Sequence, residues 1–578
     1  MAFNFDANRP VVAGTRHAVA AGHYLAAEAG FEILNHGGNA IDAGVAAGLA
    51  LGVVHSDIVN IAGVAPTLIW LAETQEIINI DGLGTWPKAV TPDFFQKFHG
   101  GHIPETLLRT VMPAAPAAWL TALELYGTMS FGEVAEGAIR FARDGFAMYP
   151  LLAESIADSE AGFRRWPANE AIYLPNGQPP MPGDRFVQTD LGATLQYMAD
   201  QEATKAGEGR IAGIKAAYDA FYRGDIARKI VDYHRENDGL VTMEDLDEYR
   251  VRHEPTVITH YAGIDVHCCG PWSQGPALAQ TLNLLKGTDM AALGHNSPEY
   301  IHRIAEALKL TFADRERYYG DPAFIDVPLA ELLSDEYTAL RRDLIRDGEA
   351  WPEMPPAGDP RAMLARIDDI TQFTPSPAEP HAVPADTSYC CAMDSKGNAF
   401  SATPSDTSRQ APVIPGTGLV PSSRGSQSWA DPAHPSAVAP GKRPRLTPNP
   451  ALAVRDGKAF MTFGTPGGDV QTQAMVQTFL NVVTFDMDIQ TAIEAPRFAS
   501  YSYPSSFEPH DYFPGRLDLE ARIPAETADT LASWGHKISW WPDKTWKAGG
   551  MCGIVADEKS GMFQAGADPR RAGYALAW

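Results

Sequence analysis

The chain has 578 residues, which is long enough for two or three folding units or for one large layered fold. Hydrophobic residues make up 45% of it and charged residues 20%, a balance that excludes a disordered protein. A net charge of −25 argues against nucleic acid and anionic membrane as partners, but it leaves a small-molecule substrate open.

The chain contains few cysteines, odd in number and set in apolar runs: Cys268, Cys269, Cys390, Cys391 and Cys552. This usage predicts packed thiols rather than a disulfide framework or a zinc site. The N-terminal segment has no basic stretch followed by an apolar one, and no window reaches about 18 unbroken apolar residues. We therefore expect a cytoplasmic protein without a membrane span.

The first predicted elements are two helices and a strand pair. Residues 23–38 read as a helix ended by two glycines, and residues 39–54 as a second helix capped by Asn39. The second helix is apolar on nearly all sides, so we expect it to be buried between layers. Residues 67–81 read as a strand, a turn and a strand, and helical patterns dominate from about 104 to 350.

The last third of the chain changes character. Residues 349–386 are rich in proline and read as an exposed linker. Short apolar runs follow, typical of a meander of strands, with two helices at 470–483 and 524–535. A helix-rich first part, a tether and a strand-rich last third predict an α+β layered sandwich.

A hairpin is predicted over residues 387–405, with Gly397 able to supply the positive φ of its turn. Counting outward from this turn sets Thr387 opposite Ser405. Paired residues in such a ladder lie about 4.5–5.5 Å apart. Two hydroxyl groups can therefore meet without help from distant parts of the chain.

This placement suits an N-terminal nucleophile, provided that the chain is cut between Asp386 and Thr387. The freed α-amine, with a pKa of about 8, would serve as the general base for the Thr387 hydroxyl, and Ser405 could orient that hydroxyl. The preceding linker is a segment where a cut chain can separate without harm to a core. The plain alternative is that Thr387 is only a good strand former.

A glycine turn enters a predicted helix at residues 464–475. In it, Gly467 and Gly468 could point backbone N–H groups outward as a nest for an oxyanion. A tight strand-to-helix connection without a chemical role is the alternative.

Taken together, the chain resembles the γ-glutamyltranspeptidases, which belong to the N-terminal nucleophile hydrolases. Each matching segment is weak alone, but they occur in order along nearly the whole chain. The segments are residues 37–54, 270–287, 313–324, 387–403, 441–458, 465–469 and 492–498.

The resemblance implies a four-layer αββα sandwich in the α+β class. It also implies a precursor that cuts itself before Thr387 into a large subunit, 1–386, and a small subunit, 387–578, which stay associated. It implies no metal or other cofactor, and it leaves room for a homo-oligomer of the processed heterodimers.

The resemblance further implies roles for four catalytic residues. Thr387 would be the nucleophile that forms an acyl-enzyme, and Ser405 would stand where the family has a supporting threonine. Gly467 and Gly468 would match the family's oxyanion hole.

The residues that would hold a γ-glutamyl group differ from the family pattern. Leu83 stands at the position of the carboxylate-binding arginine. Arg424 and Gln427 replace the glutamine and aspartate that hold the amino group, and Leu446 and Thr447 replace a pair of serines. Because an unpaired carboxylate or ammonium in a pocket costs several kcal/mol, these changes predict a rebuilt pocket.

We therefore expect a retained catalytic apparatus with a different acyl group. Arg424 and Arg445 add positive charge, which favours an anionic acyl group without an ammonium, such as oxamate or a dicarboxylic acid monoamide. The candidate substrate-binding residues are Arg424, Gln427, Arg445 and Thr447. The alternative for each arginine is a solvated or salt-bridged surface residue.

Three other functions stay open at this point. One is a γ-glutamyl transferase or hydrolase whose recognition groups have moved. Another is a non-catalytic ligand-binding relative, for which Ser388, in place of a second threonine, leaves room. The third is cleavage of a C–C bond by the same acyl-transfer apparatus.

Overall fold

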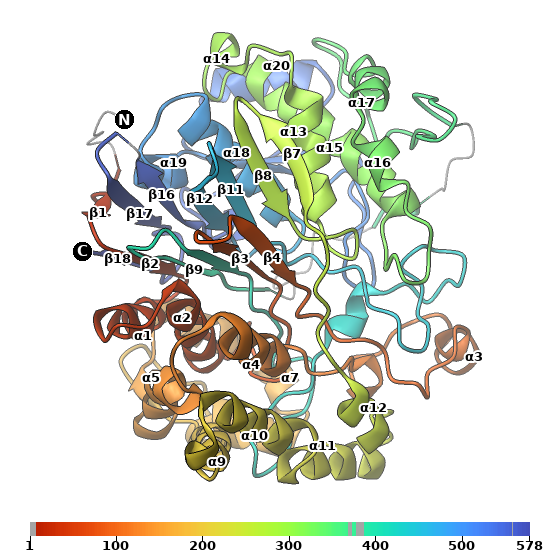
Figure 1. Cartoon of the computed structure of the whole chain (residues 1–578). Helices are drawn as coiled ribbons and strands as arrows, with labels where there is room; N and C mark the ends of the chain where they lie inside the picture. Colours follow the sequence, from red (N-terminus) through yellow and green to blue (C-terminus); the bar gives the residue numbers. More distant parts are fainter. Residues whose placement is uncertain (1–6, 368–372, 377–385, 558) are drawn as a thin grey trace.

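The computed structural model describes residues 7–367, 373–376, 386–557 and 559–578. Two antiparallel sheets lie face to face, and helices cover the outer face of each sheet (Figure 1). The predicted four-layer α+β sandwich is confirmed.

The first sheet has six strands in the order β18-β2-β9-β10-β3-β4. Its strands are β2 (Ala18–Ala21), β3 (Thr67–Leu71), β4 (Glu76–Ile80), β9 (Cys390–Met393), β10 (Ala399–Ala402) and β18 (Tyr574–Ala577). Strand β2 pairs with β9, and the last strand of the chain, β18, pairs with β2, so both lie on the same side of the β9–β10 hairpin.

The second sheet has seven strands in the order β1-β17-β16-β12-β11-β8-β7. Its strands are β1 (Val12–Gly14), β7 (Val257–Tyr261), β8 (Ile264–Cys268), β11 (Ala451–Arg455), β12 (Lys458–Gly464), β16 (Cys552–Asp557) and β17 (Met562–Ala567). The pair β7–β8 interrupts the stretch that the sequence predicted to be mostly helical.

The side chains of β9 alternate between two cores, as the period of a strand requires. Cys390 and Ala392 face the helices, whereas Cys391 and Met393 face the other sheet. All five cysteines are buried and unpaired, which confirms the prediction of packed thiols.

Helix α2 (Ala40–Val54) is buried along its whole length between α1 (Tyr24–Asn35) and the six-stranded sheet. Asn39 caps it through a capping box with Asp42, as the sequence predicted for this N-terminus. A Cβ atom at Gly44 would stand 2.0 Å from the ring of Phe400, so only glycine lets the helix approach β10 this closely.

The other long helices complete the two outer layers (Figure 1). On the side of the six-stranded sheet these include α4 (Ala115–Tyr126), α5 (Phe131–Asp144), α9 (Thr189–Ala203) and α10 (Arg210–Tyr222). On the side of the seven-stranded sheet they are α13 (Gly275–Leu285), α15 (Pro298–Tyr318) and α18 (Val470–Val483), joined by the short α19 (Ile489–Glu494).

A third, small sheet stands beside this body, with the order β13-β14-β15. Its strands are β13 (Phe498–Ser500), β14 (Arg516–Glu520) and β15 (Lys537–Trp541). The remaining elements are α3 (Phe94–His99), β5 (Phe146–Ala147), α6 (Pro150–Asp158), α7 (Glu160–Phe163), α8 (Pro167–Tyr173), β6 (Arg185–Phe186), α11 (Asp225–Glu236), α12 (Met243–Glu248), α14 (Met290–Leu293), α16 (Leu329–Leu332), α17 (Asp335–Arg342) and α20 (Ala525–Ser533).

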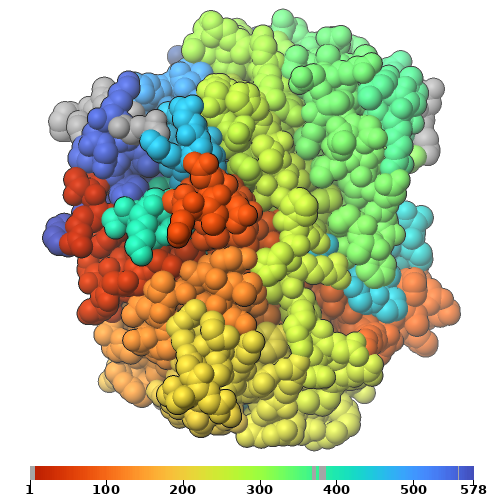
Figure 2. Space-filling model, in the orientation of Figure 1, coloured from red at the N-terminus to blue at the C-terminus, as the bar shows by residue number. Residues whose placement is uncertain are grey.

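Segments before and after residue 387 share one continuous surface (Figure 2).

The predicted exposed linker is only partly exposed: Gly358 is buried, and its N–H donates to Asp314 at 3.1 Å. The linker residues 368–372 and 377–385 lie outside the described residues. Within the described ranges, none of the helices combines the length and apolarity needed to cross a bilayer.

Candidate active site

Thr387 and Ser405 face each other across the two arms of the hairpin, which confirms the predicted register. Their hydroxyl oxygens are 2.8 Å apart, and both side chains are fully buried. Gly397 has the expected positive φ, 86°, in the turn. Local strand pairing alone therefore brings the two hydroxyl groups together.

Two donors reach the carbonyl oxygen of Asp386, in the peptide bond that precedes Thr387. Ser405 Oγ and Arg424 Nη2 each donate to it at 2.9 Å. The same Arg424 nitrogen also donates to Ser405 Oγ, and Gln471 Nε2 donates to Thr387 Oγ1 at 3.4 Å. The bond between Asp386 and Thr387 thus lies within a set of hydrogen-bond donors.

The side chain of Asp386 is held on its other side by an arginine that the sequence analysis missed. Arg571 Nη2 lies 2.6 Å from one carboxylate oxygen, and the N–H of Thr387 donates to the other at 2.8 Å. Arg571 comes from the loop before β18, 185 residues beyond Asp386, so no local pattern in the sequence could reveal the pair.

Gly467 and Gly468 connect β12 to α18 and have φ values of 125° and 56°. Both values favour glycine, and 125° is accessible to few other residues. The two glycines line the same cavity as Asp386. Asp469, which follows them, accepts from the N–H of Ser506 at 2.7 Å, which fixes the turn.

A cavity of about 640 Å³ opens beside this bond. One part of its wall is aromatic: Tyr501, Tyr503, Phe507, Phe513, Trp541 and Trp546. Another part is cationic: Arg109, Arg165, Arg409, Arg516, Lys547 and Arg571. Carboxylates of Glu105, Asp386, Asp469, Glu508, Asp511 and Asp518 also reach it. The cavity can therefore accept an anion and an apolar group at the same time.

Three of the four predicted substrate-binding residues form one row. Arg424 Nη1 lies 3.5 Å from the side-chain oxygen of Gln427, whose Nε2 donates to Thr447 Oγ1 at 3.0 Å. All three are buried, and burial lowers the pKa of Arg424 although the charges of Asp406 and Asp386 oppose the shift. Arg424 also contacts Ser405, so the row adjoins Thr387, the predicted nucleophile.

The fourth, Arg445, points elsewhere. Its Nη2 lies 2.8 Å from Glu316, and its Nη1 donates to the carbonyl of Arg315 at 3.0 Å. Burial lowers the pKa of Arg445 to about 10. Burial disfavours the charge of Glu316, but Arg445 and Arg315 outweigh it and hold the pKa of that carboxyl below its usual range. The structure thus places Arg445 in a buried ion pair rather than beside Thr387.

Two leucines stand where the family pattern has polar residues, and both lie between the sheets. Leu83 and Leu446 are both fully buried in the apolar cluster that also contains Trp272 and Tyr389. Neither position offers a charge to a substrate carboxylate.

A family model described as Gamma-glutamyltranspeptidase matches residues 26–578. The chain belongs to the gamma-glutamyltranspeptidase family. The resemblance seen in the sequence is confirmed, and so is the prediction of an enzyme with this type of N-terminal nucleophile chemistry. A relative that only binds a ligand is therefore no longer favoured.

Two relatives and one solved structure show the range of this family. The chain is 32% identical to "Acylase ACY 1 proenzyme" of Pseudomonas sp. (strain V22), over 96% of this chain and 92% of the relative. It is 30% identical to "Glutathione hydrolase-like YwrD proenzyme" of Bacillus subtilis (strain 168), over 98% of this chain and 99% of the relative. The cephalosporin acylase structure from Bacillus halodurans superposes with a TM-score of 0.85 at 27% identity, covering 100% of this chain and 98% of that one.

A histidine that the sequence analysis missed contacts Ser388, the residue that follows Thr387. His55 Nδ1 is 3.1 Å from Ser388 Oγ, and burial lowers the pKa of His55 well below its usual value. A Cβ atom at Gly22 would stand 2.2 Å from Ser388 Oγ. Ser388 is therefore fixed tightly beside Thr387, with a neutral imidazole as its partner.

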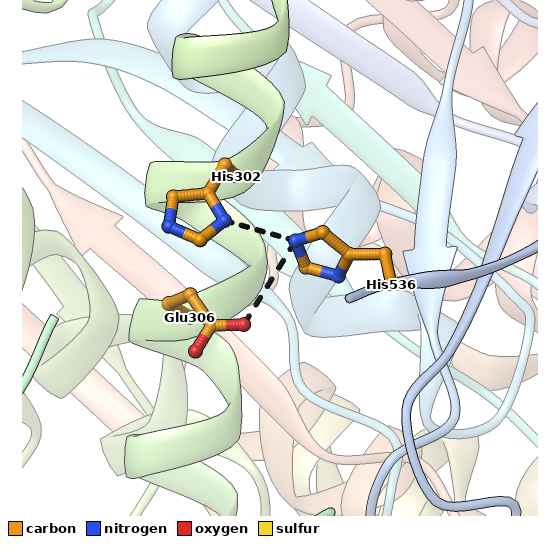
Figure 3. Close-up of side chains that lie close together, drawn as sticks. All are labelled: His302, Glu306 and His536. Atoms are coloured by element: carbon orange, nitrogen blue, oxygen red, sulfur yellow. Dashed lines mark hydrogen bonds and ion pairs between the residues drawn. The ribbon is translucent and has the colours of Figure 1, made fainter. Parts of the chain in front are cut away.

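One cluster of potential metal ligands occurs among the described residues, away from the cavity (Figure 3). His302 Nδ1 and His536 Nε2 are 2.9 Å apart, and the latter lies 4.0 Å from Glu306. The ammonium of Lys309 is 2.7 Å from the same carboxylate, and His302 Nε2 lies 2.8 Å from the carbonyl of Arg346. Because Lys309 already pairs with Glu306, a metal cation here would be repelled by the Lys309 ammonium. The contacts therefore favour a buried hydrogen-bond network over a metal site.

Proposed function

We propose that this protein cuts itself between Asp386 and Thr387 and then hydrolyses small amides whose acyl group carries a negative charge, such as oxamate or a dicarboxylic acid monoamide. The reaction passes through an ester of Thr387. The position of Arg424 carries the substrate part of the proposal. The proenzyme and acylase names of the relatives support the reaction type.

In this proposal, several groups around Thr387 activate its hydroxyl. After the cut, the α-amine of Thr387 takes the proton from its own hydroxyl. Ser405, 2.8 Å away, orients that hydroxyl, with Gln471 as a second contact. Backbone N–H groups of Gly467 and Gly468 stabilise the oxyanion formed from the substrate carbonyl.

Arg424 supplies a fixed positive charge at the acyl side. Its Nε is a buried donor without a hydrogen-bond partner among the described residues, and the nearest carboxylate, that of Asp406, is 3.9 Å from it. A buried cation with spare donors gains from an anionic ligand. The apolar environments of Leu83 and Leu446 leave the γ-glutamyl carboxylate without its family partners.

The leaving amine occupies the aromatic part of the cavity in this proposal. Tyr501 and Trp541 stand edge to face, with ring centres 6.4 Å apart. Phe507 belongs to the same wall, and the Arg424 guanidinium is 5.5 Å from its ring, so the aromatic wall adjoins the proposed acyl side. The cavity of about 640 Å³ is large for an acyl group of a few carbons alone. We therefore favour amines with a flat apolar group over ammonia.

A matched series of anilides tests the acyl side. Glutaryl, γ-glutamyl and butyryl anilides share a leaving group: the butyryl group is uncharged, the glutaryl group adds a carboxylate, and the γ-glutamyl group adds a carboxylate and an ammonium. A charge-assisted contact contributes about 1.5–3 kcal/mol, so we expect kcat/KM for glutaryl anilide to exceed that for butyryl anilide about 10- to 100-fold. Fastest turnover of γ-glutamyl anilide would contradict the proposal.

A γ-glutamyl hydrolase or transferase is the second candidate. Glu105 and Glu508 line the cavity and could hold an ammonium, and one relative carries the name of a glutathione hydrolase. Adding a dipeptide acceptor to the γ-glutamyl anilide assay separates the two candidates. Strong acceptor-stimulated release would favour the second one.

A further inference from the structure

We propose that Arg424 and Ser405 form an oxyanion site for self-cleavage, distinct from the glycine pair at residues 467–468 that serves the substrate. The inference rests on the proposed function, because it assumes that Thr387 attacks the carbonyl carbon of Asp386. It assigns the oxyanion role of these two residues to self-cleavage, which happens once in each chain.

The donors are already in place in the uncut chain. Arg424 Nη2 and Ser405 Oγ both lie 2.9 Å from the Asp386 oxygen, inside the range at which donors stabilise an oxyanion. Within the described part of the chain, neither the N–H of Gly467 nor that of Gly468 donates to this oxygen. Self-cleavage and substrate turnover therefore place their negative charge on different donors.

One arrangement of hydrogens satisfies all the contacts. The Thr387 hydroxyl donates to Ser405 Oγ, the Ser405 hydroxyl donates to the Asp386 oxygen, and Arg424 donates to both Ser405 and that oxygen. As Thr387 Oγ1 bonds to the Asp386 carbon, its proton moves to Ser405. Negative charge builds up on the former carbonyl oxygen, where Arg424 stabilises it, until the proton of Ser405 moves to that oxygen and neutralises it.

The adduct then collapses. The carbonyl re-forms, the bond from the Asp386 carbon to the Thr387 nitrogen breaks, and the nitrogen takes the proton that the oxygen gives up. The products are an ester of Thr387 and a free α-amine. Water next hydrolyses the ester, which releases the Asp386 α-carboxylate and restores the Thr387 hydroxyl.

Arg424 is held firmly enough for this role. Its side chain is 1% exposed and lies against the ring of Phe507. Asp406, 3.9 Å away, is fixed by the hydroxyls of Ser422 and Ser423. The new α-carboxylate of Asp386 forms against the same guanidinium, which marks the site as one that accepts an anion.

The test measures self-cleavage of purified protein at 25 °C, as the loss of full-length chain with time on denaturing gels. Arg424→Gln keeps a polar side chain but removes the charge and the second donor, and we expect the full-length chain to disappear about 10²- to 10³-fold more slowly. The cleavage rate of Arg424→Lys should lie between those of the wild type and Arg424→Gln. Arg235→Gln is the matched control: Arg235 pairs with Asp232 on an exposed face of α11, and this variant should be cut at the wild-type rate.

A wild-type cleavage rate in folded Arg424→Gln would overturn the inference. Circular dichroism and thermal melting report whether the variant folds. If it does not fold, Ser405→Ala carries the test: it breaks the proton path, and unchanged cleavage there would overturn the inference equally. The glutaryl anilide assay on the processed fraction separates the two proposals, since slow cleavage with normal turnover supports this inference and contradicts the substrate role of Arg424.

Discussion

At the scale of single residues, the site depends on backbone conformations that few side chains permit. Gly467 has a φ of 125°, and an added Cβ would find its nearest neighbour, the Cβ of Val470, at 3.5 Å. Space is therefore adequate, and the constraint at this position is the backbone itself. Substitution must rotate the peptide groups that carry the proposed oxyanion donors.

We expect Gly467→Ala to lower kcat at least about 100-fold, the cost of losing an oxyanion donor. The matched control is Gly441→Ala, with a φ of 70° and no heavy atom within 4 Å of the added Cβ. It should cost about 1 kcal/mol of stability and leave kcat unchanged. Equal kcat values for the two variants would show that the glycine turn has no catalytic role.

At the scale of elements, α15 joins the two predicted subunits through polar side chains in the core. His302 and Glu306 extend from this helix towards His536, which precedes β15 in the small subunit (Figure 3). His536 is 3% exposed, and burial, helped by the charge of Lys309, lowers its pKa to about 2. It is therefore neutral in the folded protein across the ordinary pH range.

This histidine should make the fold sensitive to acid. The unfolded chain binds a proton at His536 below about pH 6.5 and the folded chain does not, so stability falls as the pH drops from 6.5 towards 2. At pH 5 the loss from this one residue is about 2 kcal/mol. Urea unfolding at pH 7 and pH 5 should show a smaller loss in His536→Gln than in the wild type.

The surface residue His260 provides the control, since its side chain is 65% exposed. His260→Gln should keep the wild-type dependence on pH. If His536→Gln loses as much stability between pH 7 and pH 5 as the wild type does, the buried histidine does not set this sensitivity.

At the scale of the whole molecule, the features that could be predicted from the sequence are those set by residues close together along the chain. The register between Thr387 and Ser405 follows from one short turn, and the capped helix at 40–54 from its first residues and apolar length. The contacts of Arg571 with Asp386 and of His55 with Ser388 join segments 185 and 333 residues apart, which no periodicity encodes. Arg424 was identified from its position in the family pattern, but its contact with the carbonyl oxygen of Asp386 could be found only from the fold.

The sheets also explain how a cut chain would stay together. In the six-stranded sheet, the β9–β10 hairpin from after residue 387 lies between β2 and β3 from before it, so strands from both sides of residue 387 pair with each other. The seven-stranded sheet joins β8 to β11 and β1 to β17 in the same way. Separation of the fragments would break backbone pairing in both sheets, so we expect them to remain associated.

The central claim is that Thr387 becomes a new N-terminus and then carries the acyl group. Intact mass measurement of denatured, active protein tests it most directly, with Thr387→Ala as the partner variant. The account predicts fragments of 1–386 and 387–578 for the wild type, and one uncut, inactive chain for the variant. Active wild-type protein with an unbroken chain, or a variant that is cut and turns over amide, would contradict it.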